Sequence, residues 1–214
     1  MAASFRVICE RSRLSRPGAR FICTFFVALV WLGASALSSD RATEDSIRAF
    51  IERVNAASLD LFSSGSEAEA RSRTRALLAW AFDVPAMAKE ALGYAWETAT
   101  KEERSELLAA FEEDVIGAYL RRMRPEGTNL TFIGNRPPSD GNYFAASRRS
   151  VPGKKDQIWI WSMRPDGDTW RITDLLLGGH SAVYTTRHEY ASVLESNNGD
   201  LNALIAFMRK RAAQ

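Results

Sequence analysis

The sequence WRITDLLLGGHSAVYTTRHEY, Trp170 to Tyr190, joins a strand pattern to a helix pattern across a pair of glycines. Its first part is rich in apolar residues at a period of two, and Gly178 and Gly179 stand where such a strand would end. Ser181 precedes the next segment, and serine is a favoured residue at a helix N-cap. The stretch therefore predicts a strand that turns into a helix, in a chain that combines both elements.

Three earlier segments also have the two-residue period of strands. They are NLTFIG (129–134), NYFAASRR (142–149) and QIWIWSMR (157–164), and the turns between them are rich in Pro, Gly, Asn and Asp. Together with DTWRITDLLL (168–177) they make four strands that are joined by short loops. We predict an antiparallel meander sheet over about residues 129–178, and hence an α+β fold.

The half of the chain that precedes the sheet has the period of helices, with Ile47, Ile51 and Val54 as the first apolar face. Residues with capping side chains mark the predicted helix starts, and two of these residues are followed by a Glu three positions later, as in a capping box. The predicted N-caps are Thr43, Ser66, Asp83 and Thr100. Two C-terminal helices follow the sheet, with Ser181 and Asp200 as their caps.

The longest predicted helix begins after Thr100 and ends at Pro125 and Gly127. It would run for about 24 residues and span about 36 Å. One of its faces carries Leu108, Phe111, Val115, Tyr119 and Met123. Such a helix is long enough to cover a whole sheet.

Residues 1–36 have the pattern of a secretory signal peptide, because five arginines precede an apolar run that ends in Ala34-Ser35-Ala36. A membrane anchor is the alternative, but the apolar run from Phe21 to Leu37 is at the short end of what a spanning helix needs. We expect cleavage and export, which leaves residues 37–214 as a single domain.

The leader also holds much of the positive charge and both cysteines, Cys9 and Cys23. Five of the 28 basic residues and one of the 26 acidic residues lie in it, which leaves 23 and 25 in the rest of the chain. A nearly neutral protein without a basic stripe is a poor match for nucleic acid. A mature chain without cysteine can form neither a disulfide nor a thiolate metal site.

The strand QIWIWSMR is apolar on both faces, with Ile158 and Ile160 on one and Trp159, Trp161 and Met163 on the other. An antiparallel strand with one solvated face should alternate polar with apolar residues. This strand is therefore either covered on both sides or presents one face to an apolar ligand.

The sequence GGHSA at 178–182 suggests a serine enzyme only superficially. It lacks the second glycine of a nucleophile elbow, and His180 and His188 do not have the spacing of a metal pair. A small isomerase with Asp174 or Asp114 as its base is another possibility. We expect Asp174 to be structural and to pair with Arg187, and we predict no catalytic or metal-binding residues.

The segments 77–123 and 170–211 together resemble the MlaC/toluene-tolerance family of periplasmic lipid carriers. The pieces that carry the resemblance are Phe82-Asp83, Leu92-Gly93 with Trp96, Phe111 and Tyr119, Trp170 with Asp174, Gly179 with Ser181, and Arg187. The chain departs from the family at His180, where an aliphatic residue is more common.

The resemblance implies a soluble, monomeric periplasmic carrier in which helices cover a curved sheet of about four strands, an NTF2-like sheet lobe with a helical lobe. An apolar cavity would hold the acyl chains of a phospholipid as cargo, with no cofactor, while the headgroup stays largely in solvent. Such carriers shuttle lipid between an outer-membrane lipoprotein complex and an inner-membrane ABC transporter with MCE domains, and so maintain outer-membrane lipid asymmetry. A hopanoid-associated branch of the family leaves the lipid class open.

We assign the cavity walls by position. The floor consists of Trp159, Trp161 and Met163, or of Ile158 and Ile160, with Leu175 and Leu177 beside them, and the roof consists of Trp96, Phe111, Val115 and Tyr119. A protein-binding adaptor without lipid is the alternative, in which all of these residues are ordinary core. The basic residues 209–211 would serve an anionic headgroup, an acidic partner or simply a solvated helix end.

Overall fold

The computed structural model describes residues 28–63, 65–124 and 128–214. The chain divides into two units, Met1–Asp40 and Arg41–Gln214. The predicted signal peptide lies largely outside the described residues, which include only its positions 28–36, as the first part of a helix. None of the described helices combines the length and the apolar character that a membrane span requires.

Helix α1 (Ala28–Leu59) is longer than the sequence predicts. Thr43 lies inside α1, so its prediction as an N-cap is wrong. No Pro or Gly occurs between Ala34 and Leu59, and nothing local therefore stops the helix from extending toward the N-terminus. The predicted apolar face is correct, because Ile47, Ile51 and Val54 are buried.

The next helices begin at the predicted caps. Ser66 caps α2 (Glu67–Ala81), Asp83 caps α3 (Val84–Leu92), and Thr100 and Glu103 form a complete capping box on α5 (Lys101–Met123). The predicted ends at Pro125 and Gly127 lie outside the described residues. The sequence patterns did not predict the short helix α4 (Tyr94–Thr98), which follows Gly93 at the end of α3.

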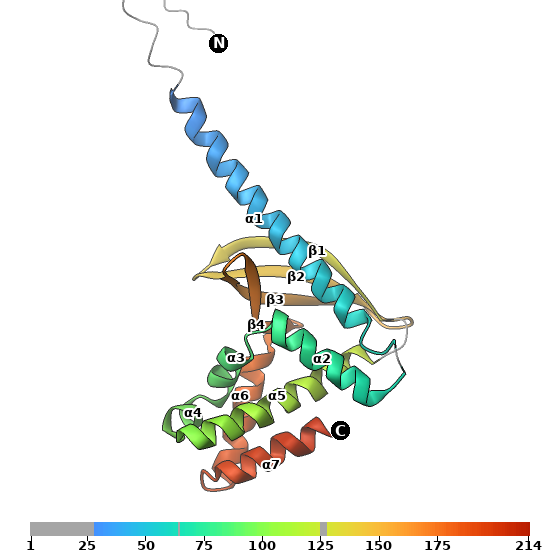
Figure 1. Cartoon of the computed structure of the whole chain (residues 1–214), viewed down its shortest axis with the longest axis vertical. Helices are drawn as coiled ribbons and strands as arrows, with labels where there is room; N and C mark the ends of the chain where they lie inside the picture. The colour runs from blue at the N-terminus through green and yellow to red at the C-terminus, as the bar shows by residue number, and fades with distance from the viewer. Residues whose placement is uncertain (1–27, 64, 125–127) are drawn as a thin grey trace, which may run out of the picture. The chain divides into compact units, whose positions relative to one another are not determined.

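The sheet is the predicted antiparallel meander, with one further strand (Figure 1). Its order is β1 (Asn129–Ser139), β2 (Asn142–Ser150), β3 (Gln157–Asp166), β4 (Thr169–Leu177) and β5 (His180–Ser181). Strand β1 extends beyond the predicted Gly134 through Pro137 and Pro138, which fall in an irregularity of the β1–β2 pairing. An edge strand tolerates prolines that cannot donate a ladder hydrogen bond.

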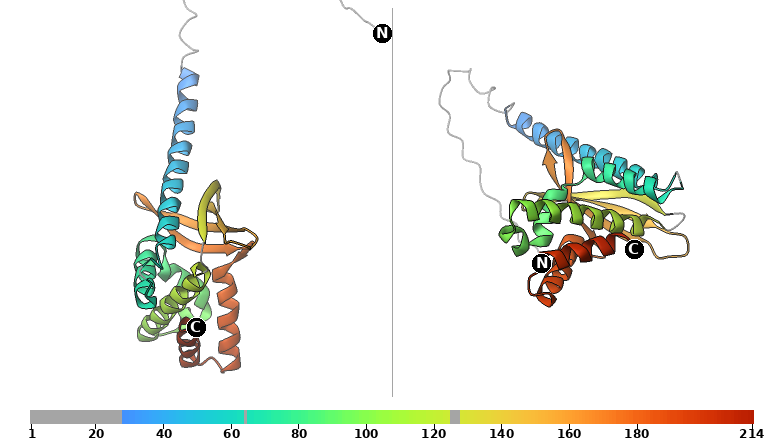
Figure 2. Two further views of the ribbon diagram at one scale, coloured as in Figure 1. Left: turned by 90° about the vertical axis from the view of Figure 1, so that its right-hand side faces the viewer. Right: turned by 60° about the horizontal axis from the view of Figure 1, so that its bottom comes forward.

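Helices α6 (Ala182–Ser196) and α7 (Leu201–Ala212) have Ser181 and Asp200 as their N-caps, as predicted. In two views, α5 lies between the sheet and α7 (Figures 1 and 2). The α+β fold that the sequence predicts is confirmed.

The core lies on one face of the sheet, where Trp159, Trp161 and Met163 are buried. On the other face of β3, Ile158 is 43% exposed and Ile160 is half-buried. Aromatic rings join β3 to the helical layer, because the ring of Tyr119 on α5 meets that of Trp159 at 6.4 Å. Strand β3 is therefore buried on its inner face and only partly covered on the other.

Candidate functional site: an apolar cavity beneath the long helix

A cavity of about 610 Å³ lies between α5, α6 and the end of β4. Its apolar lining comes from several elements and consists of Phe82, Met87, Phe111, Val115, Ala118, Tyr119, Leu175, Leu177, Ala182 and Val183. Its polar lining includes Asp114, Arg121, Arg122, His180, Glu189, Tyr190 and Arg211. The volume lies within the roughly 300–1,000 Å³ that small-molecule sites occupy. The cavity can therefore take an apolar ligand and offer polar contacts to it.

The structure brings five of the predicted wall residues together in this cavity. They are Phe111, Val115 and Tyr119 of the predicted roof and Leu175 and Leu177 of the predicted floor. The α5 residues share a helical face, and Leu175 and Leu177 lie two apart on one face of β4. Periodicity alone is sufficient to group each set.

The other four predicted wall residues lie elsewhere. Trp159, Trp161 and Met163 are buried core side chains, and the rings of Trp159 and Trp161 meet at 5.7 Å. Trp96 lies on α4, and the Arg104 guanidinium lies over its indole ring, 5.8 Å from the ring centroid. None of these four residues lines the cavity. Trp159 and the alternative floor residues, Ile158 and Ile160, line a neighbouring groove.

The sequence patterns did not point to Met87, Ala118 or Val183 as wall residues. They come from α3, α5 and α6, and they meet only because the three helices converge over β4. Of the missed residues, only Phe82 carried a sequence signal, since it belongs to the Phe82-Asp83 pair of the resemblance.

A buried ion pair forms one side of the cavity. Asp114 on α5 is 1% exposed and accepts hydrogen bonds from Arg211 Nε at 2.6 Å, from Arg211 Nη2 and from Tyr190 Oη at 2.6 Å. Arg211 also pairs with Glu189. These contacts join α5, α6 and α7 in one network.

The network changes the pKa values of Tyr190 and Arg211. Burial, and then the negative charge of Asp114, raise the pKa of Tyr190. Burial acts to lower the pKa of Arg211, but the hydrogen bond and charge of Asp114 outweigh it and raise that pKa. A carboxylate that already accepts three hydrogen bonds is poorly suited to act as a general base.

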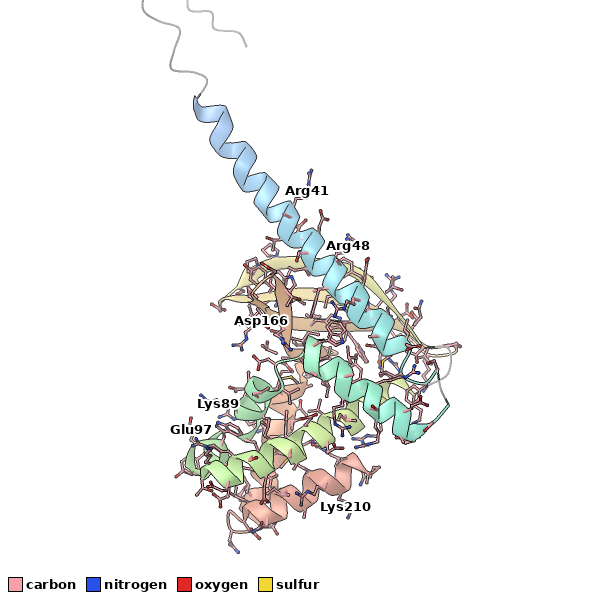
Figure 3. All side chains as sticks on the ribbon, viewed as in Figure 1. Arg41, Arg48, Lys89, Glu97, Asp166 and Lys210 are labelled. Atoms are coloured by element: carbon pink, nitrogen blue, oxygen red, sulfur yellow. The ribbon has the colours of Figure 1, made fainter. Side chains whose placement is uncertain are left out.

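Of the basic residues 209–211, Arg211 is bound by Asp114 and Glu189 within the protein. Lys210 instead lies on the outer side of α7 (Figure 3).

Asp174 has a structural role, as predicted, but its partners are different from the predicted one. Its Oδ1 accepts hydrogen bonds from the backbone N–H of Val183 at 3.1 Å and of Leu175 at 2.8 Å. Arg187 instead pairs with Glu90 on α3 at 2.7 Å. The predicted Asp174–Arg187 pair is therefore wrong. Asp174 instead satisfies one first-turn amide of α6, that of Val183, which has no partner within the helix.

The Gly-Gly-His-Ser segment lies at the edge of the cavity. Ser181 Oγ accepts a hydrogen bond from Tyr184 N at 2.9 Å, as an N-cap does, and His180 lines the cavity. His188 packs edge-on against the Tyr184 ring at 4.4 Å. Within the described part of the chain, no three His, Cys, Asp or Glu residues lie close enough to hold a metal ion.

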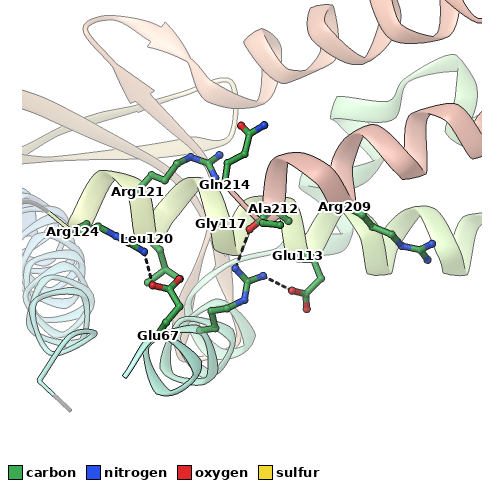
Figure 4. A pocket seen from close by; sticks show the side chains of 11 residues that line it. Glu67, Glu113, Gly117, Leu120, Arg121, Arg124, Arg209, Ala212 and Gln214 are labelled. Atoms are coloured by element: carbon green, nitrogen blue, oxygen red, sulfur yellow. Dashed lines mark hydrogen bonds and ion pairs between the residues drawn. The ribbon is translucent and has the colours of Figure 1, made fainter. Parts of the chain in front are cut away.

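A second hollow, between α2, α5 and α7, contains two ion pairs in its lining (Figure 4). Arg71 donates to the carbonyl oxygen of Ala212 at 3.0 Å and to Glu113 at 2.6 Å, and Arg124 donates to Glu67. These contacts hold the end of α7 against α2 and α5. We therefore interpret this hollow as a place where three helices are joined, and not as a binding site.

Comparison with known proteins identifies the class to which this fold and cavity belong. The model of the MlaC protein family matches residues 44–210, and the chain belongs to this family. The comparison with curated proteins gives no match.

Among solved structures, the phospholipid-binding protein from Ralstonia solanacearum, in complex with a phospholipid, has a similar fold. The TM-score is 0.63 at 18% sequence identity, and the alignment covers 78% of this chain and 97% of that chain. At this level of identity the likeness shows a shared fold.

Proposed function

We propose that this protein is a lipid carrier that holds phospholipid acyl chains in the cavity between α5, α6 and β4. The observation that carries the proposal is the apolar lining of this cavity, in a chain of the MlaC family whose fold is shared with a phospholipid-binding protein. The polar lining near Arg122 and His180 leaves a place for a headgroup.

The physical need for a carrier supports the proposal. Exposing the roughly 30 methylenes of a two-chain lipid to water costs about 24 kcal/mol, at about 0.8 kcal/mol for each methylene. Lipid monomers therefore do not cross an aqueous gap unaided at a useful rate. A protein that buries the chains removes most of this barrier.

The proposed setting is the periplasm, to which the signal-like segment 1–36 would direct the chain. There the protein, as a monomer, would pass lipid between an outer-membrane lipoprotein complex and an inner-membrane ABC transporter with MCE domains. Phospholipid is the proposed cargo, and the alternative of a hopanoid is decided by the experiment below.

The first test is native mass spectrometry of the protein purified gently from the periplasm, followed by extraction and identification of the bound lipid. A one-to-one phospholipid adduct is the expected result. A hopanoid adduct would change the cargo class. A protein that carries no lipid and takes none from labelled vesicles would contradict the proposal and favour a protein-binding adaptor.

A blocking variant links the lipid to this cavity. Ala118 is half-buried in the cavity wall, so Ala118→Trp should fill the space and abolish the adduct. Ala109→Trp adds the same volume at an exposed position of the same helix and should leave the adduct unchanged. If both variants keep their lipid, the binding site lies elsewhere.

A further inference from the structure

Arg149 is a buried cation without an acidic partner. It lies at the end of the inner face of β2, in the same alternating row as Ala145 and Ser147, and it is 7% exposed. Among the described residues, no carboxylate is within ion-pair distance of it, and its buried Nε has no hydrogen-bond partner. Burial lowers the pKa of the Arg149 guanidinium, and no negative charge offsets this effect.

The partners that Arg149 does have are neutral. One Nη donates to the carbonyl oxygen of Arg122 at 2.6 Å, and the other donates to Gln157 Oε1 at 3.2 Å. The C-terminal end of α5 supplies only about half a negative charge. Since Gln157 is exposed, its side chain can give way to a stronger acceptor.

Arg122 adds a second cation beside the first. The Arg122 side chain is exposed, and its Nη1 donates to the carbonyl oxygen of Ala118 at 2.8 Å. Desolvation of the guanidinium by the protein around it, followed by the charges of Arg121 and Arg211, lowers its pKa. The acids that act on it from a distance, Glu189 and Asp114, are both already bound by Arg211.

Both cations line a groove of about 690 Å³ at the start of β3 and the end of β4. Lys155 adds a third cation, while the acidic residue in the lining, Asp156, pairs with Arg148 at 3.7 Å. Arg122 and Leu177 line this groove and the apolar cavity alike. A ligand can therefore have chains in the cavity and a negative group in the groove.

We propose that Arg149 and Arg122 form a subsite for the phosphate group of the lipid cargo. The inference rests on the proposed function, and it adds that the headgroup is bound through its phosphate. A phosphate oxygen would replace Gln157 Oε1 on Arg149 and supply the charge that this guanidinium lacks. Arginine is well suited to this contact because its N–H groups match the geometry of phosphate oxygens.

The test compares two lipids with the same chains, phosphatidic acid and diacylglycerol, by displacement of a fluorescent lipid from the full protein. Hydrogen bonds to the charged phosphate should make phosphatidic acid bind about 10- to 100-fold more tightly than diacylglycerol. Arg149→Gln should reduce this ratio to near one by weakening phosphatidic acid alone. Arg136→Gln removes the same charge from an exposed position of β1 that lines neither the cavity nor the groove, and it should leave the ratio unchanged.

Arg122→Gln gives a second route to the same result if Arg149→Gln does not fold. A wild-type ratio near one, or a ratio that neither substitution changes, would overturn the phosphate subsite and leave the carrier proposal standing. Failure of both lipids to bind would overturn the two proposals together. Arg149-dependent binding of glycerol 3-phosphate as tight as that of phosphatidic acid would reassign the site to a soluble phosphate compound.

Discussion

Gly117 on α5 lies against the backbone of Ala212 on α7, so closely that a Cβ atom at Gly117 would be 2.7 Å from the Ala212 carbonyl oxygen. No side chain larger than hydrogen fits at this helix crossing without movement of backbone. The close approach also brings α7 near enough for Arg211 to reach Asp114 across the gap.

Gly117→Ala should therefore destabilise the protein, although alanine is the better helix former. Overpacking costs about 1–3 kcal/mol and is only partly offset by a gain of about 1 kcal/mol in helix propensity. Urea unfolding would measure the change. Ser105→Ala, at an exposed position of the same helix, should change stability by less than about 0.5 kcal/mol. A higher urea midpoint for Gly117→Ala would contradict the close crossing.

Asp114→Asn should reduce the free energy of unfolding by about 3 kcal/mol, because it removes the buried partner of Arg211. Glu189→Gln removes the other carboxylate from the same guanidinium, but the Glu189 side chain is 46% exposed, and the expected loss is below about 1 kcal/mol. Denaturant unfolding of both variants makes the comparison. Equal losses would mean that burial of Asp114 does not determine the strength of this network.

Stability should fall at alkaline pH because burial raises the pKa values of Tyr119 and Tyr190. In the unfolded chain a tyrosine has a pKa near 10 and loses its proton above that pH. In the folded protein both tyrosines keep their protons at the same pH. Their stabilising effect is complete below pH 10 and is lost as the pH rises above it, at about 1.4 kcal/mol for each pH unit and each tyrosine.

Tyr190→Phe isolates one of these contributions. The free energy of unfolding, measured at several pH values above 10, should fall less steeply in this variant than in the wild type. The difference in slope should be about 1.4 kcal/mol for each pH unit. Identical slopes would mean that Tyr190 does not keep its proton in the folded state.

Val115→Asn places an amide in the apolar wall of the cavity and should reduce lipid affinity about 10-fold, since an unpaired polar group in an apolar site costs about 1–3 kcal/mol. Val193 on α6 is half-buried like Val115 but does not line the cavity, so Val193→Asn is the matched control. Lipid displacement assays would compare them. Equal effects of the two substitutions would indicate a general loss of packing.

The sequence predicted the parts of the fold that depend on local chemistry. Ser66, Asp83, Thr100, Ser181 and Asp200 all cap the expected helices, because a capping side chain acts on amides two or three residues away. Thr43 failed because a good capping residue does not end a helix that can continue through it.

The site was less accessible to prediction because it depends on contacts that are distant in sequence. Trp159 and Trp161 are the large apolar residues expected of a cavity floor, but they are buried, and the ring of Tyr119 meets that of Trp159 edge-on. Arg149 follows small and polar residues on β2, so no apolar pattern marks it as an inner-face residue. Its burial becomes visible only when α5 is placed over the end of the sheet.

The simple order of the sheet has a consequence for how the chain reaches its folded state. Each strand pairs with its neighbours in sequence. The loops that must close to form the ladder are short, and closing each of them costs little chain entropy. The Asp114–Arg211 contact instead joins residues 97 positions apart. Refolding kinetics should therefore show early protection of amides in the meander, with the junction of α5 and α7 gaining protection last.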